Sequence, residues 1–243
     1  MRLRTLTPLL LVCLTGIATP QSPEFETASI HPNHCGTSPA GMRLTGGQLT
    51  ILNAPLQRIL GAALAIGEDR IDSLLAGPPW ITTECYDITA KLPPGASTAQ
   101  FAPMLQALLR ERFAMSFHRE TRDVPAYALI VSKSGLKAQP AKPGGRTGFR
   151  IRPGHIESES ATMAGLTDKL SRLADRPAVD KTSLTGNYEF RLDWAPDPTL
   201  NDAGSGPSLY TAIEEQLGLK LDARKEPMEV VVIDQIAKVP TEN

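Results

Sequence analysis

The feature that most constrains the fold is an internal similarity between two stretches of the chain. The run MLQALLRERFAMSFHRETRDVPAYALIV in the first stretch resembles SLYTAIEEQLGLKLDARKEPMEVVVIDQ in the second. Tyr86 and Tyr188 lie 102 residues apart, as do Pro125 and Pro227, so the register barely drifts. A long fixed period is the sequence signature of repeated structural units. We therefore predict two similar tandem halves.

Each half combines β-prone segments with amphipathic helices. The segments YDITAKL and YEFRLDW alternate apolar and polar residues, which is typical of strands with one buried face. Between Phe101 and Phe113, apolar residues recur every three or four positions, which predicts a helix packed on a sheet. Gly218 is placed to end the matching helix of the second half. The predicted fold class is α+β, each half being a small antiparallel or mixed sheet covered by amphipathic helices.

Two extended segments close each half. MSFHRETR and AYALIVSK flank Pro125 in the first half, and LKLDARK and MEVVVIDQ flank Pro227 in the second. Because proline cannot donate to a strand ladder and favours turns, we interpret each pair of segments as a hairpin. The runs ALIV and VVVI are predicted to be central strands, since exposed edges of that composition would promote aggregation.

The first residues of the sequence have the pattern of an export signal. Arg2 and Arg4 precede an apolar stretch from Leu6 to Leu14, and the small residues at positions 16 and 18 suit cleavage. We therefore expect an exported protein, periplasmic or extracellular. No other apolar run is long enough to cross a bilayer, so we expect no transmembrane segment in the mature chain.

Composition divides the rest of the chain. Between the two halves, proline, glycine and lysine accumulate without apolar periodicity, which indicates a linker. The expected parts are a cleaved signal peptide at 1–18, an N-terminal extended segment at 19–45, a first α+β unit at 46–135, a Pro/Gly/basic linker at 136–152 and a second α+β unit at 153–243.

The charge of the chain is nearly balanced, with 25 Lys and Arg against 26 Asp and Glu. Proteins that bind phosphate backbones need an excess of clustered positive charge. We therefore expect no nucleic-acid partner.

Two cysteines remain after the expected cleavage. In an oxidising compartment Cys35 and Cys85 can form one disulfide, which would fix the N-terminal segment to the strand that begins at Cys85. Alternatively, His31 and His34 lie close to Cys35 in the sequence, and the four side chains could form a metal site. Their spacing matches no common zinc pattern, and a plain polar loop is a third interpretation.

The segment FHRETR groups several acid/base side chains. Strand alternation places His118, Glu120 and Arg122 on one face. This trio is a candidate acid/base or anion-binding site. The alternative is a solvated strand face with cross-strand charge pairs, which is the commoner arrangement.

Two further positions are candidate ligand-binding residues. Asp180 and Lys181 open the segment DKTSLTG, which is either a ligand loop or a turn whose polar side chains satisfy the backbone. Trp80 follows a rigid Gly-Pro-Pro turn, so its indole is either an exposed binding platform or a plug for the first core.

The sequence contains no motif for nucleophilic, metal-dependent or phosphate chemistry. It has no G-x-S-x-G, H-E-x-x-H or P-loop pattern. We therefore assign no catalytic residue, no metal and no cofactor.

Several blocks of the sequence carry a family resemblance. FETASIHPN, GPPW, FHRETRDVPAYALIV, PAVDKTSLTGNYEFRLDWAPD and the C-terminal SLYTAIEEQLGLKLDARKEPMEVVVIDQIAKVPTEN resemble an exported family expanded in soil acidobacteria. That family has no established activity, so the resemblance assigns no functional residue. Relatives of the domain are joined to membrane sensor peptidases of the BlaR type, which implies an extracytoplasmic sensing or binding role.

These observations favour a non-catalytic binding or interaction module that recognises a protein or a small molecule outside the cytoplasm. Two alternatives stay open. One is a hydrolase that acts on a cell-envelope or extracellular polymer, which requires a second acid/base group or a nucleophile near His118. The other is a structural or assembly component that polymerises by strand addition at an open sheet edge.

Overall fold

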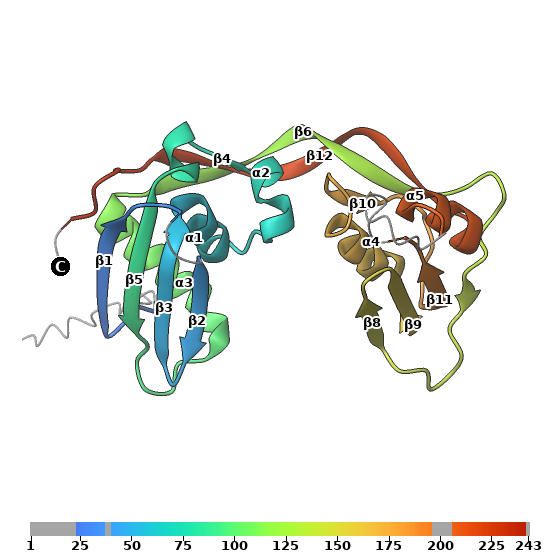
Figure 1. Cartoon of the computed structure of the whole chain (residues 1–243), viewed down its shortest axis with the longest axis horizontal. Helices are drawn as coiled ribbons and strands as arrows, with labels where there is room; N and C mark the ends of the chain where they lie inside the picture. The colour runs from blue at the N-terminus through green and yellow to red at the C-terminus, as the bar shows by residue number, and fades with distance from the viewer. Residues whose placement is uncertain (1–22, 37–39, 196–205, 242–243) are drawn as a thin grey trace, which may run out of the picture.

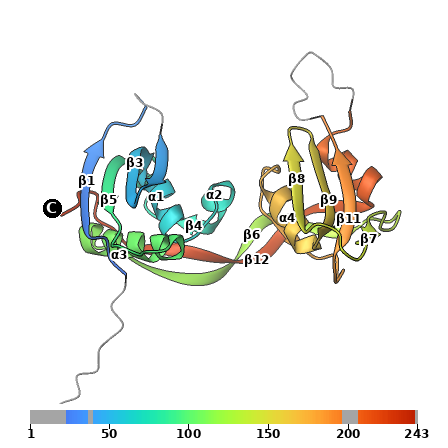
Figure 2. The same cartoon turned by 90° about the horizontal axis from the view of Figure 1, so that it is seen from below.

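A computed structural model describes residues 23–36, 40–195 and 206–241 as two lobes joined by a long two-stranded ribbon (Figure 1). The ribbon consists of β6 (Ser116–Val131) and β12 (Leu219–Gln235), which pair antiparallel along nearly their whole length. Both views place the two lobes on the same side of the ribbon, so the molecule has the shape of an arch (Figure 2). The signal peptide predicted at 1–18 lies outside the described residues.

The first lobe is a four-stranded antiparallel sheet covered on one face by helices. Its strand order is β1-β5-β3-β2, and the helices α1 and α3 pack on the buried face. Large apolar side chains such as Leu49, Ile88 and Phe113 fill this first core. The elements are β1 (Thr27–Asn33), β2 (Gly41–Thr45), β3 (Gln48–Pro55), α1 (Leu56–Ala63), α2 (Ile71–Leu74), β4 (Leu75–Ala76), β5 (Cys85–Lys91) and α3 (Phe101–Phe113).

The second lobe has the same layered design. Its sheet has the order β7-β11-β9-β8, with α4 and α5 against a second core that contains Ile156, Leu166 and Leu192. The α5 helix continues as one π-helical turn, and Gly218 ends it at φ 66°, as its position in the sequence predicts. The elements are β7 (Gln139–Pro140), β8 (Gly148–Arg152), β9 (His155–Ala161), α4 (Met163–Ser171), β10 (Ala178–Asp180), β11 (Tyr188–Asp193) and α5 (Leu209–Ala212).

The prediction of two separate hairpins is wrong. The segments around Pro125 form one continuous strand, β6, and those around Pro227 form β12, and each strand pairs with the other. At the middle of the ribbon the two prolines lie opposite Lys225 and Asp123. Proline is tolerated there because a two-stranded ribbon leaves one side of each strand unpaired, so the missing N–H costs no ladder bond.

The ribbon exchanges a long strand between the lobes. The first half of the sequence supplies β6, whose end packs in the second core, and the second half supplies β12, whose end packs in the first. The short strand β10 adds parallel to β6, and β4 adds parallel to β12. Val124 lies opposite Glu226, and the two residues are 102 positions apart, which is also the interval of the sequence repeat. A two-fold axis through this pair would therefore relate the two strands. Duplication of the halves stays a prediction.

The segments expected to be plain connections contribute to the sheets. The N-terminal segment 19–45 supplies β1 and β2, and residues 136–152, which have the composition of a linker, supply β7 and β8. Composition missed these strands because β7 contains only two residues and β8 is an exposed, arginine-containing edge. The α+β class itself is confirmed.

The disulfide alternative for the two cysteines is confirmed. Cys35 and Cys85 are bonded, with their Cα atoms 5.4 Å apart. Because β1 pairs with β5 in a register that places Asn33 opposite Cys85, the bridge closes the end of this strand pair. Within the described ranges, no group of three His, Cys, Asp or Glu side chains could hold a metal ion. Also among the described residues, no helix has the length and apolar character needed to span a bilayer.

A carboxylate is buried at the centre of the ribbon. Glu226 is 4% exposed and accepts from Arg224 at 2.5 Å, and the Lys181 ammonium lies 3.2 Å from its other oxygen. Burial alone would raise the pKa of the Glu226 carboxyl, but the bonds from Arg224 and Lys181 hold it below its ordinary value. The ionised form therefore stabilises the fold.

We expect loss of the disulfide to destabilise the first lobe. Replacing both cysteines by alanine should lower the free energy of unfolding by about 2 to 4 kcal/mol, because the bridge closes a long loop in the unfolded chain. Urea denaturation of oxidised wild type, reduced wild type and the double variant tests this. Equal midpoints for all three would show that the bridge contributes nothing.

We expect Glu226→Gln to lower the free energy of unfolding by about 1 to 2 kcal/mol at neutral pH, because two charge-assisted bonds are lost. Since the folded pKa lies below the ordinary 4.5, the stabilisation is complete above that value and disappears as the pH falls through the folded pKa. Urea titrations of both proteins across this range measure the difference. If the difference in free energy of unfolding between wild type and Glu226→Gln grew as the pH fell, the stabilising role of the ionised carboxylate would be contradicted.

Candidate functional site

The trio predicted from FHRETR lies on the open surface of the ribbon. His118 Nδ1 is 2.7 Å from the Asp234 carboxylate, His118 Nε2 is 3.5 Å from Glu120, and Arg122 forms an ion pair with Glu120. The hydrogen bond with Asp234 raises the pKa of His118, which favours the imidazolium. All four side chains are well exposed. The arrangement is a cross-strand chain of charges, in which each carboxylate is already occupied by a cation.

Asp180 and Lys181 serve the structure around the ribbon. Asp180 accepts hydrogen bonds from the Thr182 backbone N–H at 2.9 Å and from its hydroxyl at 2.7 Å, which forms a capped turn. Lys181 pairs with the buried Glu226. Both side chains therefore have partners that explain their presence without a ligand.

Trp80 belongs to a different element from these residues. It belongs to a 3₁₀ helix at Pro79–Thr82 and packs, half-buried, against the first core. The structure thus places the six candidate residues in three locations: Trp80 at the first core, the trio on the exposed ribbon, and Asp180 with Lys181 beside the second lobe. It does not bring them together into one site.

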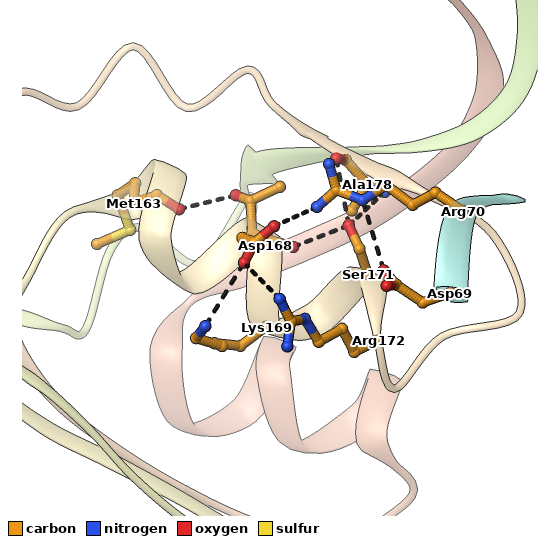
Figure 3. A network of polar contacts seen from close by, with 9 residues as sticks. Asp69, Arg70, Met163, Asp168, Lys169, Ser171, Arg172 and Ala178 are labelled. Carbon is orange, nitrogen blue, oxygen red and sulfur yellow. Dashed lines mark hydrogen bonds and ion pairs between the residues drawn. The ribbon is translucent and has the colours of Figure 1, made fainter. Parts of the chain in front are cut away.

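A polar network connects the two lobes beneath the ribbon (Figure 3). Arg70, at the end of the 3₁₀ helix Glu68–Arg70 in the first lobe, forms an ion pair with Asp168 on α4 of the second. Asp168 also lies 3.5 Å from the Lys169 ammonium and 3.6 Å from the Arg172 guanidinium. We call the Arg70–Asp168 pair the latch. A pocket of about 400 Å³ lies beside it and is lined by residues of both lobes and of the ribbon.

The latch acts on a helix that is fixed to the ribbon. The Ser171 hydroxyl accepts from the Ala178 N–H at 2.8 Å and donates to the Thr167 carbonyl at 3.0 Å, and it is fully buried (Figure 3). These bonds connect α4 to β10, which pairs with β6. Asp168 is therefore held in a fixed place relative to the ribbon. Its ion pair with Arg70 then connects α4 of the second lobe to the first lobe.

The second lobe carries an apolar pocket of about 600 Å³. Three of its lining side chains are large and half-exposed: Ile151 at 50%, Leu173 at 42% and Tyr210 at 43%. Trp194 and Leu209 complete its apolar wall. We call these five residues, together with Arg152, which also lines the pocket, the aromatic groove. Large apolar side chains that converge at a surface hollow are typical of binding sites.

One wall of the aromatic groove is held by a polar cluster. The hydroxyls of Tyr127 and Tyr210 donate to the Asp175 carboxylate at 2.9 and 3.1 Å, and the two rings lie 5.7 Å apart. Burial raises the pKa of Tyr210, as do its hydrogen bonds with the Tyr127 hydroxyl and the Asp175 carboxylate, so its phenol stays protonated. A protonated, doubly anchored phenol positions a ring for contact and is unsuited to act as a nucleophile or base.

The groove also has one charged group that faces solvent. Among the residues that the structure describes, Arg152 has no ion-pair partner, whereas Arg150 pairs with Glu157 and Arg191 pairs with Asp193. A guanidinium at the rim of an apolar wall suits a ligand with an apolar body and an anionic group.

Sequence patterns did not reveal this groove. Its residues come from the assumed linker, from the residues after α4, from the end of β11 and from α5, so they meet only in the folded lobe. Trp194 is the residue that could have indicated the groove from the sequence, because a tryptophan at a strand end needs either a core or a ligand to cover its large apolar surface.

Comparisons with known proteins give one match. Residues 57–236 match the model of a family described as "Protein of unknown function (DUF3738)". No curated protein and no solved structure matches the chain. The match covers the second lobe, the whole ribbon and the part of the first lobe from α1 onward, and it leaves out β1, β2 and β3.

We expect Arg70→Gln to broaden the distribution of distances between the lobes with little loss of stability. The latch is partly exposed, so its removal should cost at most about 1 kcal/mol. Double electron–electron resonance between one spin label on each lobe measures the distribution.

The matched control is Arg58→Gln, which removes an ion pair with Glu68 inside the first lobe. If both variants keep the wild-type distance distribution, the ribbon alone fixes the lobes and the latch has no orienting role.

Proposed function

We propose that this chain, which belongs to the DUF3738 family, is an exported, non-catalytic protein that binds a small amphipathic organic anion in the aromatic groove. The observation that carries this proposal is the convergence of Ile151, Leu173, Trp194 and Tyr210 on one hollow that Arg152 also lines. Leaving such surface exposed to water is unfavourable by roughly 25 cal/mol per Å² of apolar area, which a bound ligand would recover.

The chemistry of the groove defines the ligand class. Trp194 and Tyr210 offer ring surface to an aromatic or branched aliphatic body. Arg152 offers a guanidinium fork to a carboxylate, sulfonate or phosphate group. A pocket of about 600 Å³ has the size usual for small-molecule sites.

Export is the location that best suits the chain. The basic and apolar pattern of residues 1–18 is that of a secretory signal, and the Cys35–Cys85 disulfide suits an oxidising compartment. We propose the same setting as for the soil acidobacterial relatives that the sequence resembles, some joined to BlaR-type sensor peptidases. Binding without catalysis would then report the presence of a ligand outside the cytoplasm.

The hydrolase alternative has less support. A hydrolase needs a base beside a nucleophile or a positioned water. His118 is the base that the sequence analysis singles out, and it contacts Asp234 and Glu120 on an open strand. We therefore place binding ahead of hydrolysis.

Anilinonaphthalene sulfonate, an aromatic body with one sulfonate, is a direct probe of the groove. We expect saturable fluorescence enhancement with wild type, binding about tenfold weaker in Trp194→Ala, and binding about threefold weaker in Arg152→Gln. A fluorescence titration with each protein measures the dissociation constants.

The matched control is Leu52→Ala, which removes a half-exposed apolar side chain of the first lobe. Circular dichroism must show the same fold in all four proteins, since the dye also binds partly unfolded chains. If Trp194→Ala and Leu52→Ala bind the dye as wild type does, the groove is not the binding site.

A further inference from the structure

Within the described residues, the sheet of each lobe protects one of its edges and leaves the other open. The edge strand β1 contains Pro32 and ends near the disulfide, and β7 has only two residues, of which one is Pro140. Proline removes a backbone donor, and short strands offer little ladder, so these are the devices by which proteins prevent edge pairing. The opposite edges, β2 and β8, have neither device.

The open edges share a sequence pattern and an orientation. β2 begins Gly-Met-Arg-Leu and β8 begins Gly-Phe-Arg-Ile, so each alternates apolar residues with a central arginine. Figure 1 shows β2 and β8 as the edges that face the space between the lobes. All five residues of β2 are exposed. A regular strand that leaves its outer N–H and C=O groups free is a template for another strand.

The two faces of β2 have different chemistry. Met42 lies opposite Ile51 and Leu44 opposite Leu49, which places both on the core side of the sheet, yet they are 42% and 38% exposed. The helices therefore leave the apolar layer open at this edge. Arg43 projects from the other face, and within the described ranges it has no ion-pair partner.

The arginine distinguishes β2 from β8. Arg150 of β8 lies 3.0 Å from Glu157 and 3.6 Å from Glu159, so its charge is already compensated. The charge of Arg43 is available to a partner. A strand added beside β2 would set one side chain next to Arg43 and its neighbours on either side next to Met42 and Leu44.

We propose that the β2 edge binds an extended segment of a partner protein, in which apolar and acidic residues alternate, by strand addition. The main-chain bonds of β2 supply affinity, the exposed apolar layer takes the apolar side chains, and Arg43 selects a carboxylate between them. This site lies on the first lobe and is independent of the aromatic groove on the second.

A second copy of this chain is a poorer occupant. Arg43 is the middle residue of β2, so antiparallel pairing of two β2 strands about their centres would place the two guanidinium groups opposite each other. Like charges directly opposite on one face of a sheet are destabilising. The charge of the edge thus favours an acidic partner over self-association.

The test uses a short fluorescent peptide of alternating valine and glutamate, with a valine and lysine peptide for comparison. Fluorescence anisotropy should show that wild type prefers the glutamate peptide. Arg43→Glu should weaken that binding about tenfold and strengthen binding of the lysine peptide. Lys133→Glu, an equal change of charge at an exposed position, should leave both affinities unchanged.

Backbone pairing is tested separately from charge. Two versions of the glutamate peptide carry N-methyl groups on alternate residues, in the two opposite phases. Strand addition predicts that one phase abolishes binding and the other retains it, because only alternate N–H groups face β2.

Three results would overturn the proposal: no binding of the glutamate peptide to wild type, equal binding to wild type and Arg43→Glu, or equal effects of the two methylation phases. Sedimentation that showed a dimer unable to bind the peptide would assign the edge to a second copy instead. Dye binding at the aromatic groove should be unchanged by Arg43→Glu, so failure here is distinguishable from failure of the groove.

Discussion

The pairing of β6 with β12 is the interaction on which the rest of the structure depends. Each strand begins in one core and ends in the other: Val231 and Ile233 are buried in the first, and Leu129 and Leu219 in the second. A two-stranded ribbon is marginally stable by itself. The ribbon is stable here for two reasons. Hydrophobic burial fixes it at both ends, and at its middle the buried Glu226 carboxylate forms ion pairs with Arg224 and Lys181.

This arrangement determines how the lobes can influence each other. The aromatic groove lies on the second lobe and the β2 edge on the first. The ribbon and the latch both connect these lobes, so each can transmit the effect of a ligand from one to the other. The latch is the weaker of the two, since Arg70 and Asp168 are partly exposed. A ligand or partner shifts the lobe orientation by its difference in affinity for the two arrangements.

Local patterns predicted much of the fold and little of the candidate site. The alternation in YDITAKL, the periodicity up to Phe113 and the cysteine pair each depend on neighbouring residues or on compartment chemistry, and all three match the structure. Whether the chain turns at Pro125 or runs straight depends on a partner strand a hundred residues away, which no local pattern encodes. No local pattern encodes the aromatic groove either, because its side chains converge only after α4, β11 and α5 have packed.

The central pair of the ribbon shows how the two halves differ. If the halves are copies related by a two-fold axis, Val124 and Glu226 occupy equivalent places. Both are buried, yet one is apolar and the other is an ion held by two cations. The edges differ in the same way, since Arg150 is paired with its own sheet and Arg43 is not. If the halves are copies, the ribbon keeps them in one molecule while each surface changes separately. Independent change of the two surfaces would explain why one lobe has a groove and the other an open sheet edge.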